Sequence, residues 1–188
     1  TVIGIVRTMQ SGLLAVSKNA SYGNQSASPN TAGVKIGSII VQNQSTSESI
    51  RVTTLSVAVT YGAGTSSANL SALKTSETSA SGSVPQQPAT AAASGTGTNT
   101  FSVDFTVAPG ATKTIDILAD SSSSAGVTAT VSTNVTVTSI GAVSNVSAST
   151  ASGANQTITF YTGTLATPTV VASSSTVSQL VAAANGGS

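Results

Sequence analysis

Two side chains on which most enzymes depend are missing from this chain of 188 residues, which has no cysteine and no histidine. Without cysteine it can form no disulfide, thiolate metal site or thiol nucleophile. Without histidine it lacks the usual general base and the commonest transition-metal ligand, so a Ser-His-Asp triad cannot be assembled. The sequence therefore predicts a protein that is not an enzyme and that uses no cofactor.

Charged residues are also scarce. They make up 6% of the chain, against about 25% in an average protein. Six basic and five acidic residues leave a net charge of +1, which provides no basic surface for nucleic acid or anionic lipid. A surface of Ser, Thr, Ala, Gly and Asn needs another means of staying soluble, either attached glycans or burial within a polymer.

The five acidic residues form no catalytic pair of carboxylates. Glu48 and Glu77 lie in Ser-rich segments, and Asp104 lies on the outer face of a predicted strand. Asp116 and Asp120 are the candidates for a calcium site completed by backbone carbonyls, but no loop with alternating acids supports such a site. We therefore predict no metal site and no catalytic residue.

Alternation of apolar and polar residues recurs along the chain, whereas helical patterns are nearly absent. Residues 101–107 place their Phe and Val side chains on one face, and residues 114–119 follow after the turn APGAT, which predicts a hairpin. Residues 127–137 place Val127, Ala129 and three further valines inward. In residues 50–61 the phase of the apolar residues changes, which predicts a bulge near Thr53.

These patterns predict about eight to ten strands and an all-β fold, an Ig-like antiparallel β-sandwich with an N-terminal extended strand. A jelly-roll-like arrangement is the alternative. The predicted organisation is an N-terminal strand at 1–16, one sandwich domain at 17–175 with a low-complexity loop at 76–99, and a tail at 176–188. A last edge strand is expected around Pro168, because proline suits an edge position.

The N-terminal segment contains a short, β-prone apolar stretch formed by Val2, Ile3, Ile5, Val6 and Met9. Two interpretations remain open. The stretch is either the first strand of its own sandwich or a donor strand that completes the sheet of a neighbouring subunit. Residues 1–17 lack the basic stretch and long apolar run of a signal peptide, as expected of a processed, exported chain. No run approaches the roughly 18–20 apolar residues that span a membrane.

Seven Asn-x-Ser/Thr sequons are the candidate modification sites. They begin at Asn19, Asn24, Asn43, Asn69, Asn134, Asn145 and Asn155. Several are expected by chance in a chain so rich in Ser and Thr, so glycosylated and unmodified asparagines both remain open. Covalent glycans would explain how a nearly uncharged surface stays soluble.

Five strand-like segments follow one another between residues 33 and 140: GVKIGSIIVQN, SIRVTTLSVAVT, NLSALKT, TFSVDFTVAPGATKTIDILAD and AGVTATVS. Their order resembles a β-sandwich module from secreted surface proteins of candidate-phyla (ultra-small) bacteria, and VAPG at 107–110 with TKT at 112–114 is the most distinctive piece. The composition and the apolar N-terminal segment are similar to the glycosylated, thread-like filament subunits of thermophilic archaea. The second resemblance implies an N-terminal donor strand, and neither implies a catalytic site.

Together these observations predict a structural subunit of an extracellular filament or pilus-like fibre on a microbial cell surface. Identical subunits would be joined by donor-strand complementation through residues 1–16, with no nucleic acid and no membrane span. One alternative is an adhesive or carbohydrate-binding module, for which Tyr22, Tyr61 and Tyr161 are the available tyrosines and tryptophan is absent. The other alternative is a domain of an S-layer-type surface coat.

Overall fold

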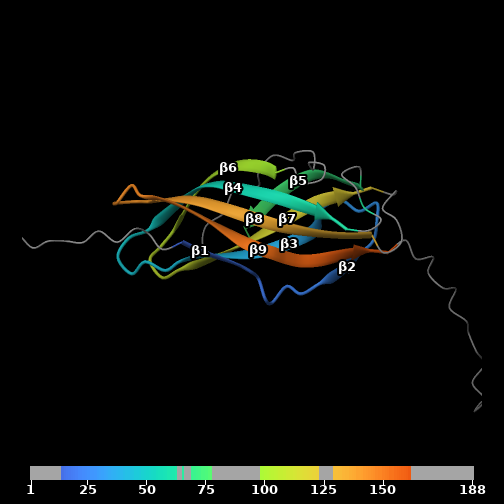
Figure 1. Cartoon of the computed structure of the whole chain (residues 1–188), viewed down its shortest axis with the longest axis horizontal. Helices are drawn as coiled ribbons and strands as arrows, with labels where there is room; N and C mark the ends of the chain where they lie inside the picture. Colours follow the sequence, from blue (N-terminus) through green and yellow to red (C-terminus); the bar gives the residue numbers. More distant parts are fainter. Residues whose placement is uncertain (1–13, 63–64, 66–68, 78–97, 123–128, 162–188) are drawn as a thin grey trace, which may run out of the picture.

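The computed structural model describes residues 14–62, 65, 69–77, 98–122 and 129–161, and its nine elements are all β-strands (Figure 1). They form two facing sheets. The four-stranded sheet has the order β1 (Leu14–Lys18), β3 (Val34–Asn43), β7 (Thr112–Ser121) and β5 (Leu70–Glu77). The five-stranded sheet has the order β2 (Gln25–Ala27), β9 (Ser147–Phe160), β8 (Ala129–Gly141), β4 (Ile50–Tyr61) and β6 (Thr98–Val107).

The order of the strands within the two sheets is that of an immunoglobulin-like sandwich, which confirms the predicted fold class. The four-stranded sheet corresponds to strands A, B, E and D, and the five-stranded sheet extends the G, F, C row. One pair departs from the expected antiparallel arrangement, because β2 pairs in parallel with β9. The chain also reaches β5, in the D position, before it reaches β6 beside β4.

The predicted hairpin across the turn APGAT is wrong. β6 pairs with β4 in one sheet, while β7 lies between β3 and β5 in the other. Gly110, at φ 69°, turns the chain from the first sheet to the second, and the Ala111 amide donates to the Ala108 carbonyl over 3.0 Å. Two strands that each have one apolar face can face each other across a core as readily as they can pair, and alternation alone does not distinguish these outcomes.

The predicted bulge near Thr53 is confirmed. The register of β4 shifts between Val52 and Thr54 against both of its neighbours, β6 and β8. The extra residue reverses the phase of alternation, so that Leu55 and Val57 return to the face on which Val52 lies. One irregularity therefore allows the whole strand to contribute to the core.

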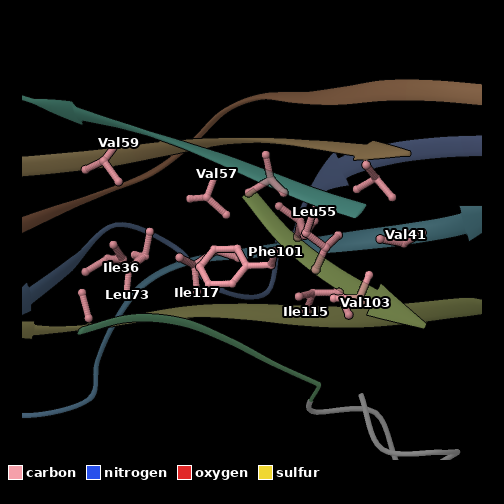
Figure 2. Packing of buried hydrophobic residues seen from close by; sticks show 14 of the residues in the cluster. Ile36, Val41, Leu55, Val57, Val59, Leu73, Phe101, Val103, Ile115 and Ile117 are labelled. Atoms are coloured by element: carbon pink, nitrogen blue, oxygen red, sulfur yellow. The ribbon is translucent and has the colours of Figure 1, made fainter. Parts of the chain in front are cut away.

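The core between the sheets is aliphatic with a few phenylalanines (Figure 2). The inward positions predicted from alternation are confirmed in β6 and in the described part of the 127–137 segment, where they are buried: Phe101, Val103, Phe105, Val107, Val131, Val135 and Val137. Val127 lies outside the described residues. In β7, Ile115 and Ile117 are fully buried and lie in the core between the two sheets (Figure 2).

Several predicted boundaries change. Residues 14–16, predicted to belong to the N-terminal strand, are part of β1 of the sandwich, and β5 and β6 extend into both ends of the predicted loop at 76–99. Residues 78–97, the predicted edge strand around Pro168 and the predicted tail at 176–188 lie outside the described residues. No helix in the described ranges is long and apolar enough to cross a membrane.

The sandwich has two ends, which we call the Leu14 end and the Phe160 end after residues found there. At the Leu14 end, Leu14 pairs with Asn43 and Ile50 pairs with Gly141. At the Phe160 end, Phe160 pairs with both Ala129 and Ala27. The described chain therefore starts at one end of the sandwich and finishes at the other (Figure 1).

Candidate assembly site

The apolar residues predicted as a donor strand, Val2 to Met9, lie outside the described residues, but the end of the predicted segment does not. Residues 14–16 belong to β1 and pair antiparallel with Val41, Gln42 and Asn43 of the same chain. They are therefore part of the chain's own sheet. Of the donor strand predicted at 1–16, these three residues are therefore excluded.

The segment that follows β1, residues 19–22, is attached to the outer face of the four-stranded sheet by a polar network. The Tyr22 hydroxyl donates to the Lys35 carbonyl over 2.6 Å, and the Lys35 ammonium lies 4.4 Å from the centre of the Tyr22 ring. Lys35 is also paired with Asp116 at 3.1 Å. The pKa of the Tyr22 phenol is raised, mainly because burial disfavours the phenolate and secondarily because of the negative charge of Asp116.

The same network joins the two sheets. The buried Ser38 hydroxyl donates to Asp116 over 2.7 Å and accepts from the Asn19 side-chain amide over 3.1 Å. From the five-stranded sheet, the Gln156 amide donates to the Asn19 carbonyl over 2.7 Å, and its oxygen accepts from the Ser38 backbone amide over 3.1 Å. Residues from Leu14 onward are therefore held within their own sandwich by both main-chain and side-chain hydrogen bonds.

The side of the sandwich opposite β1 ends in two terminal strands, one in each sheet. β1 lies beside β9, since the Thr150 hydroxyl donates to the Leu14 carbonyl over 3.3 Å. β5 and β6 are the last strands at the other side, and neither pairs with a further strand among the described residues. A sheet edge leaves a row of backbone donors and acceptors without ladder partners, and such a row can pair with another chain.

The β5 edge is irregular. Its register against β7 shifts between Ser71 and Lys74, and Ala72 adopts a left-handed conformation at φ 50°. Lys74 lies 3.9 Å from Asp120, which also accepts a 2.7 Å hydrogen bond from the Gly33 amide. Bulges and lysines are features that discourage pairing at a sheet edge, so β5 is a poor acceptor for an added strand.

The β6 edge is also irregular, because its register against β4 shifts and two β6 residues, Val103 and Asp104, lie opposite Thr53. β6 has 10 residues, compared with 8 in β5. Its polar residues Ser102, Asp104 and Thr106 are exposed on the outer face, where Asp104 forms a bidentate pair with Arg51 at 2.6 and 2.7 Å. Hydrogen bonding to Arg51 lowers the pKa of Asp104. No described β6 residue has a positive φ, in contrast to Ala72 in β5.

The loops at the Leu14 end form a rigid cap around Glu48. Its buried carboxylate accepts hydrogen bonds from the Val143 amide at 3.1 Å, and from the Ser144 amide and hydroxyl at 3.0 and 2.8 Å. These bonds, first those from Ser144, lower the pKa of Glu48. Asn43, which is fully buried, donates to the carbonyls of Glu48 and Val107 at 2.9 and 3.0 Å. The carboxylate is therefore used to hold a loop in place.

The two carboxylates considered for a calcium site are also engaged. Asp116 and Asp120 bind different partners, and no group of three or more His, Cys, Asp or Glu residues occurs in the described parts of the chain. A hollow of about 290 Å³ lies on the outer face near Arg51, Ile140 and Asn145. Its lining brings together no group of residues suited to catalysis.

The structure separates the seven predicted glycosylation sites by burial. Asn43, Asn69 and Asn155 are buried, with exposures of 0%, 6% and 7%, so a glycan could not be accommodated on these side chains in the folded chain. Asn24 and Asn145 are exposed. Asn19 and Asn134 are intermediate: the first is bound to Ser38, and the second has a buried side-chain oxygen.

Exposed large apolar side chains occur only near the ends of the described sandwich. Val143 and Val146, at 67% and 44% exposure, lie in the β8–β9 loop at the Leu14 end. Tyr161, at 52%, follows β9 at the Phe160 end. Tyr22 and Tyr61 are partly buried, so a single exposed ring among the described residues is available for stacking on sugar.

No family model matches the chain, and no curated protein matches it. Among solved structures it is similar to a PapD-like (ASH) domain, domain 7, of human CEP192, with 11% sequence identity over 86% of this chain and 94% of that domain. The TM-score is 0.32. The Ig-like fold is assigned from the strand order described above.

Proposed function

We propose that this chain is the subunit of an extracellular filament in which each copy donates an apolar N-terminal strand to the next. The observation that carries the proposal is that β1 to β9, which all lie within residues 14–160, form both sheets of an Ig-like fold. The apolar residues between Val2 and Met9 precede all nine of these strands in the chain. A β-prone segment preceding a complete sandwich is suited to strand addition.

The energy available from such a link is large. In a strand, Ile3, Ile5 and Met9 share one face, and their burial at about 2 kcal/mol each contributes about 6 kcal/mol, before any main-chain hydrogen bonds are counted. The total stability of a folded domain is about 5–15 kcal/mol. One exchanged strand can therefore join two copies about as strongly as each copy is folded. The chain has no cysteine, so copies cannot be joined by disulfides, and an exchanged strand supplies a strong link without them.

The positions of the two ends favour a linear polymer. The donor segment precedes Leu14 at one end of the sandwich, so repeated donation in a single direction joins copies end to end. Such a head-to-tail contact does not close on itself and produces a fibre. The exposed apolar side chains Val143, Val146 and Tyr161 lie at these same ends, where contacts between copies would cover them.

The outer faces of the sheets support an extracellular location for the filament. They carry mainly Ser and Thr, with few charges, for example Ser102 and Thr106 on β6. A polymer of this kind is kept soluble by covalent glycans or by close packing of copies. Asn24 and Asn145 are the exposed sequons that we propose as N-linked sites.

The test is deletion of residues 1–10 in the full chain, followed by electron microscopy. We expect fibres from the unchanged chain and only monomers from the deletion variant, with the β-sheet circular dichroism of the monomers retained. A matched pair of substitutions refines the test: Ile5→Asp should block assembly, whereas Thr8→Asp, a polar position in the same segment, should have much less effect. Normal fibres from the deletion variant would show that this segment donates no strand.

A further inference from the structure

Beyond the end-to-end link, we propose that the outer face of the five-stranded sheet binds the same face of a second copy of this chain, so that fibres associate side by side. The association of fibres rests on the proposed filament, whereas the face itself is a feature of the described residues. We call it the hydroxyl face, after six short side chains of β4, β6 and β8: Thr54, Ser56, Thr100, Ser102, Thr136 and Thr138.

The six side chains form two rows across the sheet. Each row takes one residue from each strand: Thr100, Ser56 and Thr136 in the first, and Ser102, Thr54 and Thr138 in the second. Hydroxyl oxygens within the rows lie close together, at 3.4 Å between Ser56 and Thr100. The residues that alternate with them, such as Leu55 and Val137, are fully buried in the core. The hydroxyl groups therefore point away from the core.

Charged residues are distributed unequally between the two sheets. The strands of the five-stranded sheet contain Arg51 and Asp104, which neutralise each other in a bidentate pair at 2.6 and 2.7 Å. Every other charged residue in a described strand belongs to the four-stranded sheet. Repulsion between like charges therefore does not oppose contact between two hydroxyl faces, and a surface without net charge promotes association.

Hydroxyl groups are suited to a contact between identical faces, because each can both donate and accept a hydrogen bond. In a two-fold contact the same patch meets itself, so its groups must be complementary to their own kind. A face of carboxylates or of ammonium groups does not meet this condition. Ser and Thr also lack the long, flexible side chains that lose the most rotamer freedom when they are ordered.

A second copy fits this face better than a sugar polymer does. Binding of sugars commonly uses an exposed aromatic ring for stacking. No ring is exposed in the described strands of this sheet, because Phe101, Phe105 and Phe160 are buried and Tyr61 is partly buried. The hydroxyl groups are then the main groups that the face offers to a partner.

The size of the face sets the strength of the contact. Its strands β6, β4, β8 and β9 lie about 4.8 Å apart and β6 has 10 residues, so the face measures about 19 by 33 Å, or about 600 Å². Two such faces bury about 1,200 Å², at the lower limit of stable protein interfaces. One contact is therefore weak. Two fibres lying side by side can repeat it, and repeated contacts bind far more strongly than one.

A single charge on the face tests the contact. Ser56→Glu places a carboxylate near the middle of β4, so that two such faces repel each other. We expect side-by-side bundles from the unchanged chain and single fibres from Ser56→Glu, with at least about tenfold less protein in a low-speed pellet. Mixing Ser56→Glu with Ser56→Lys fibres should restore bundles, because opposite charges then meet. Ser102→Glu, at an exposed position of the same face, is a second variant.

The matched control is Ser17→Glu, which makes the same change at an exposed position on β1 of the other sheet. It should form bundles as the unchanged chain does. Circular dichroism checks that each variant has the β-sheet content of the unchanged chain, and electron microscopy distinguishes single fibres from bundles.

The outcomes are distinct. Bundles that are lost with Ser56→Glu or Ser102→Glu and restored by the mixture support the inference. Unchanged fibres that stay single, variant fibres that bundle normally, a mixture that stays single, or loss of bundles with Ser17→Glu overturn it and leave the strand-exchange filament standing. Single unchanged fibres that sediment with insoluble cellulose, but not as Ser56→Glu, would replace the second copy by a sugar polymer and also overturn it.

The absence of any fibres would contradict the proposed function instead. The face is then tested on separate copies by sedimentation equilibrium. Association that grows with concentration and is weakened by Ser56→Glu supports the contact between hydroxyl faces. Monomers at every concentration overturn it.

Discussion

Replacement of Asn43 by alanine is the sharpest test of the cap at the Leu14 end. Asn43 is fully buried at the end of β3 and makes three side-chain hydrogen bonds. Its amide donates to the carbonyls of Glu48 and Val107 at 2.9 and 3.0 Å, and its oxygen accepts from the Ser45 amide at 3.0 Å. Asn43→Ala removes all three bonds and leaves backbone groups without these partners.

The expected magnitude follows from that count. Each buried hydrogen bond contributes about 1 kcal/mol net, so Asn43→Ala should lower the free energy of unfolding by about 3 kcal/mol, and by more where the freed groups stay unsolvated. For a chain of this size, 1 kcal/mol corresponds to a fall in Tm of about 2–4 °C, so the variant should melt about 6–12 °C lower.

Urea unfolding followed by circular dichroism measures this loss, provided that the slope with denaturant is the same for both chains. The control is Gln44→Ala at the adjacent exposed residue, which should change the free energy of unfolding by less than about 0.5 kcal/mol. If Asn43→Ala is as stable as the control, Asn43 does not hold the loops together. Mass spectrometry that finds a glycan on Asn43 in the folded protein would refute the same reasoning.

Three further predictions concern the interior. Gly37→Ala should cost about 1–3 kcal/mol, because the new methyl group would collide with the Thr133 hydroxyl, and a second change, Thr133→Ala, should restore part of the loss. Phe101→Ala should lower the free energy of unfolding by about 3–5 kcal/mol, because the ring is 3% exposed. The lowered pKa of Glu48 stabilises the fold fully above its ordinary pKa of 4.5, and this contribution is lost as the pH falls through the folded value. Glu48→Gln should therefore flatten the acid limb of the stability curve.

Each of these predictions has a contradicting result. Equal stability of Gly37→Ala and the unchanged chain would show that β3 does not approach Thr133 so closely. A loss below about 1 kcal/mol for Phe101→Ala would place the ring outside the packed core. An acid limb that is the same with Glu48→Gln would mean that another group governs it. Urea titrations between neutral and acidic pH supply all three measurements.

The alternating segments could be interpreted from the sequence because the side chains of a strand point to opposite faces in turn. That period identified the buried row from Phe101 to Val107 and the row from Val131 to Val137. It also located the bulge near Thr53, since one extra residue in a strand shifts every later apolar side chain to the opposite phase.

Strands without alternating apolar and polar residues were not predicted from the sequence. The first half of β9, SASTASGAN, contains only small and polar residues, and it becomes a strand by pairing with β8. β2 has three residues and exists through its parallel pairing with β9. Such segments are ordered by main-chain hydrogen bonds to an existing strand, so their own side chains carry little signal.

The candidate assembly site could also be predicted only in part from the sequence. The apolar stretch from Val2 to Met9 is apparent in the sequence, but which strands lie at the edges of the sheets is not. The terminal strands β5 and β6 are known only once the pairing of every other strand is known. The bulge that makes β5 a poor acceptor is a property of its register against β7, a strand more than thirty residues away in the chain.

By itself, the sequence determined the class of fold, the inward faces of the clearest strands and the absence of cysteine and histidine, because these depend on residue type and on a period of two. Only the tertiary structure decided which strands are neighbours, why the β6–β7 turn crosses between sheets, and that Asn43 and Asn155 are buried while Asn24 and Asn145 are exposed. The physical reason is that strand pairing and burial are set by contacts between residues far apart in the chain. Identical local motifs therefore reach different environments.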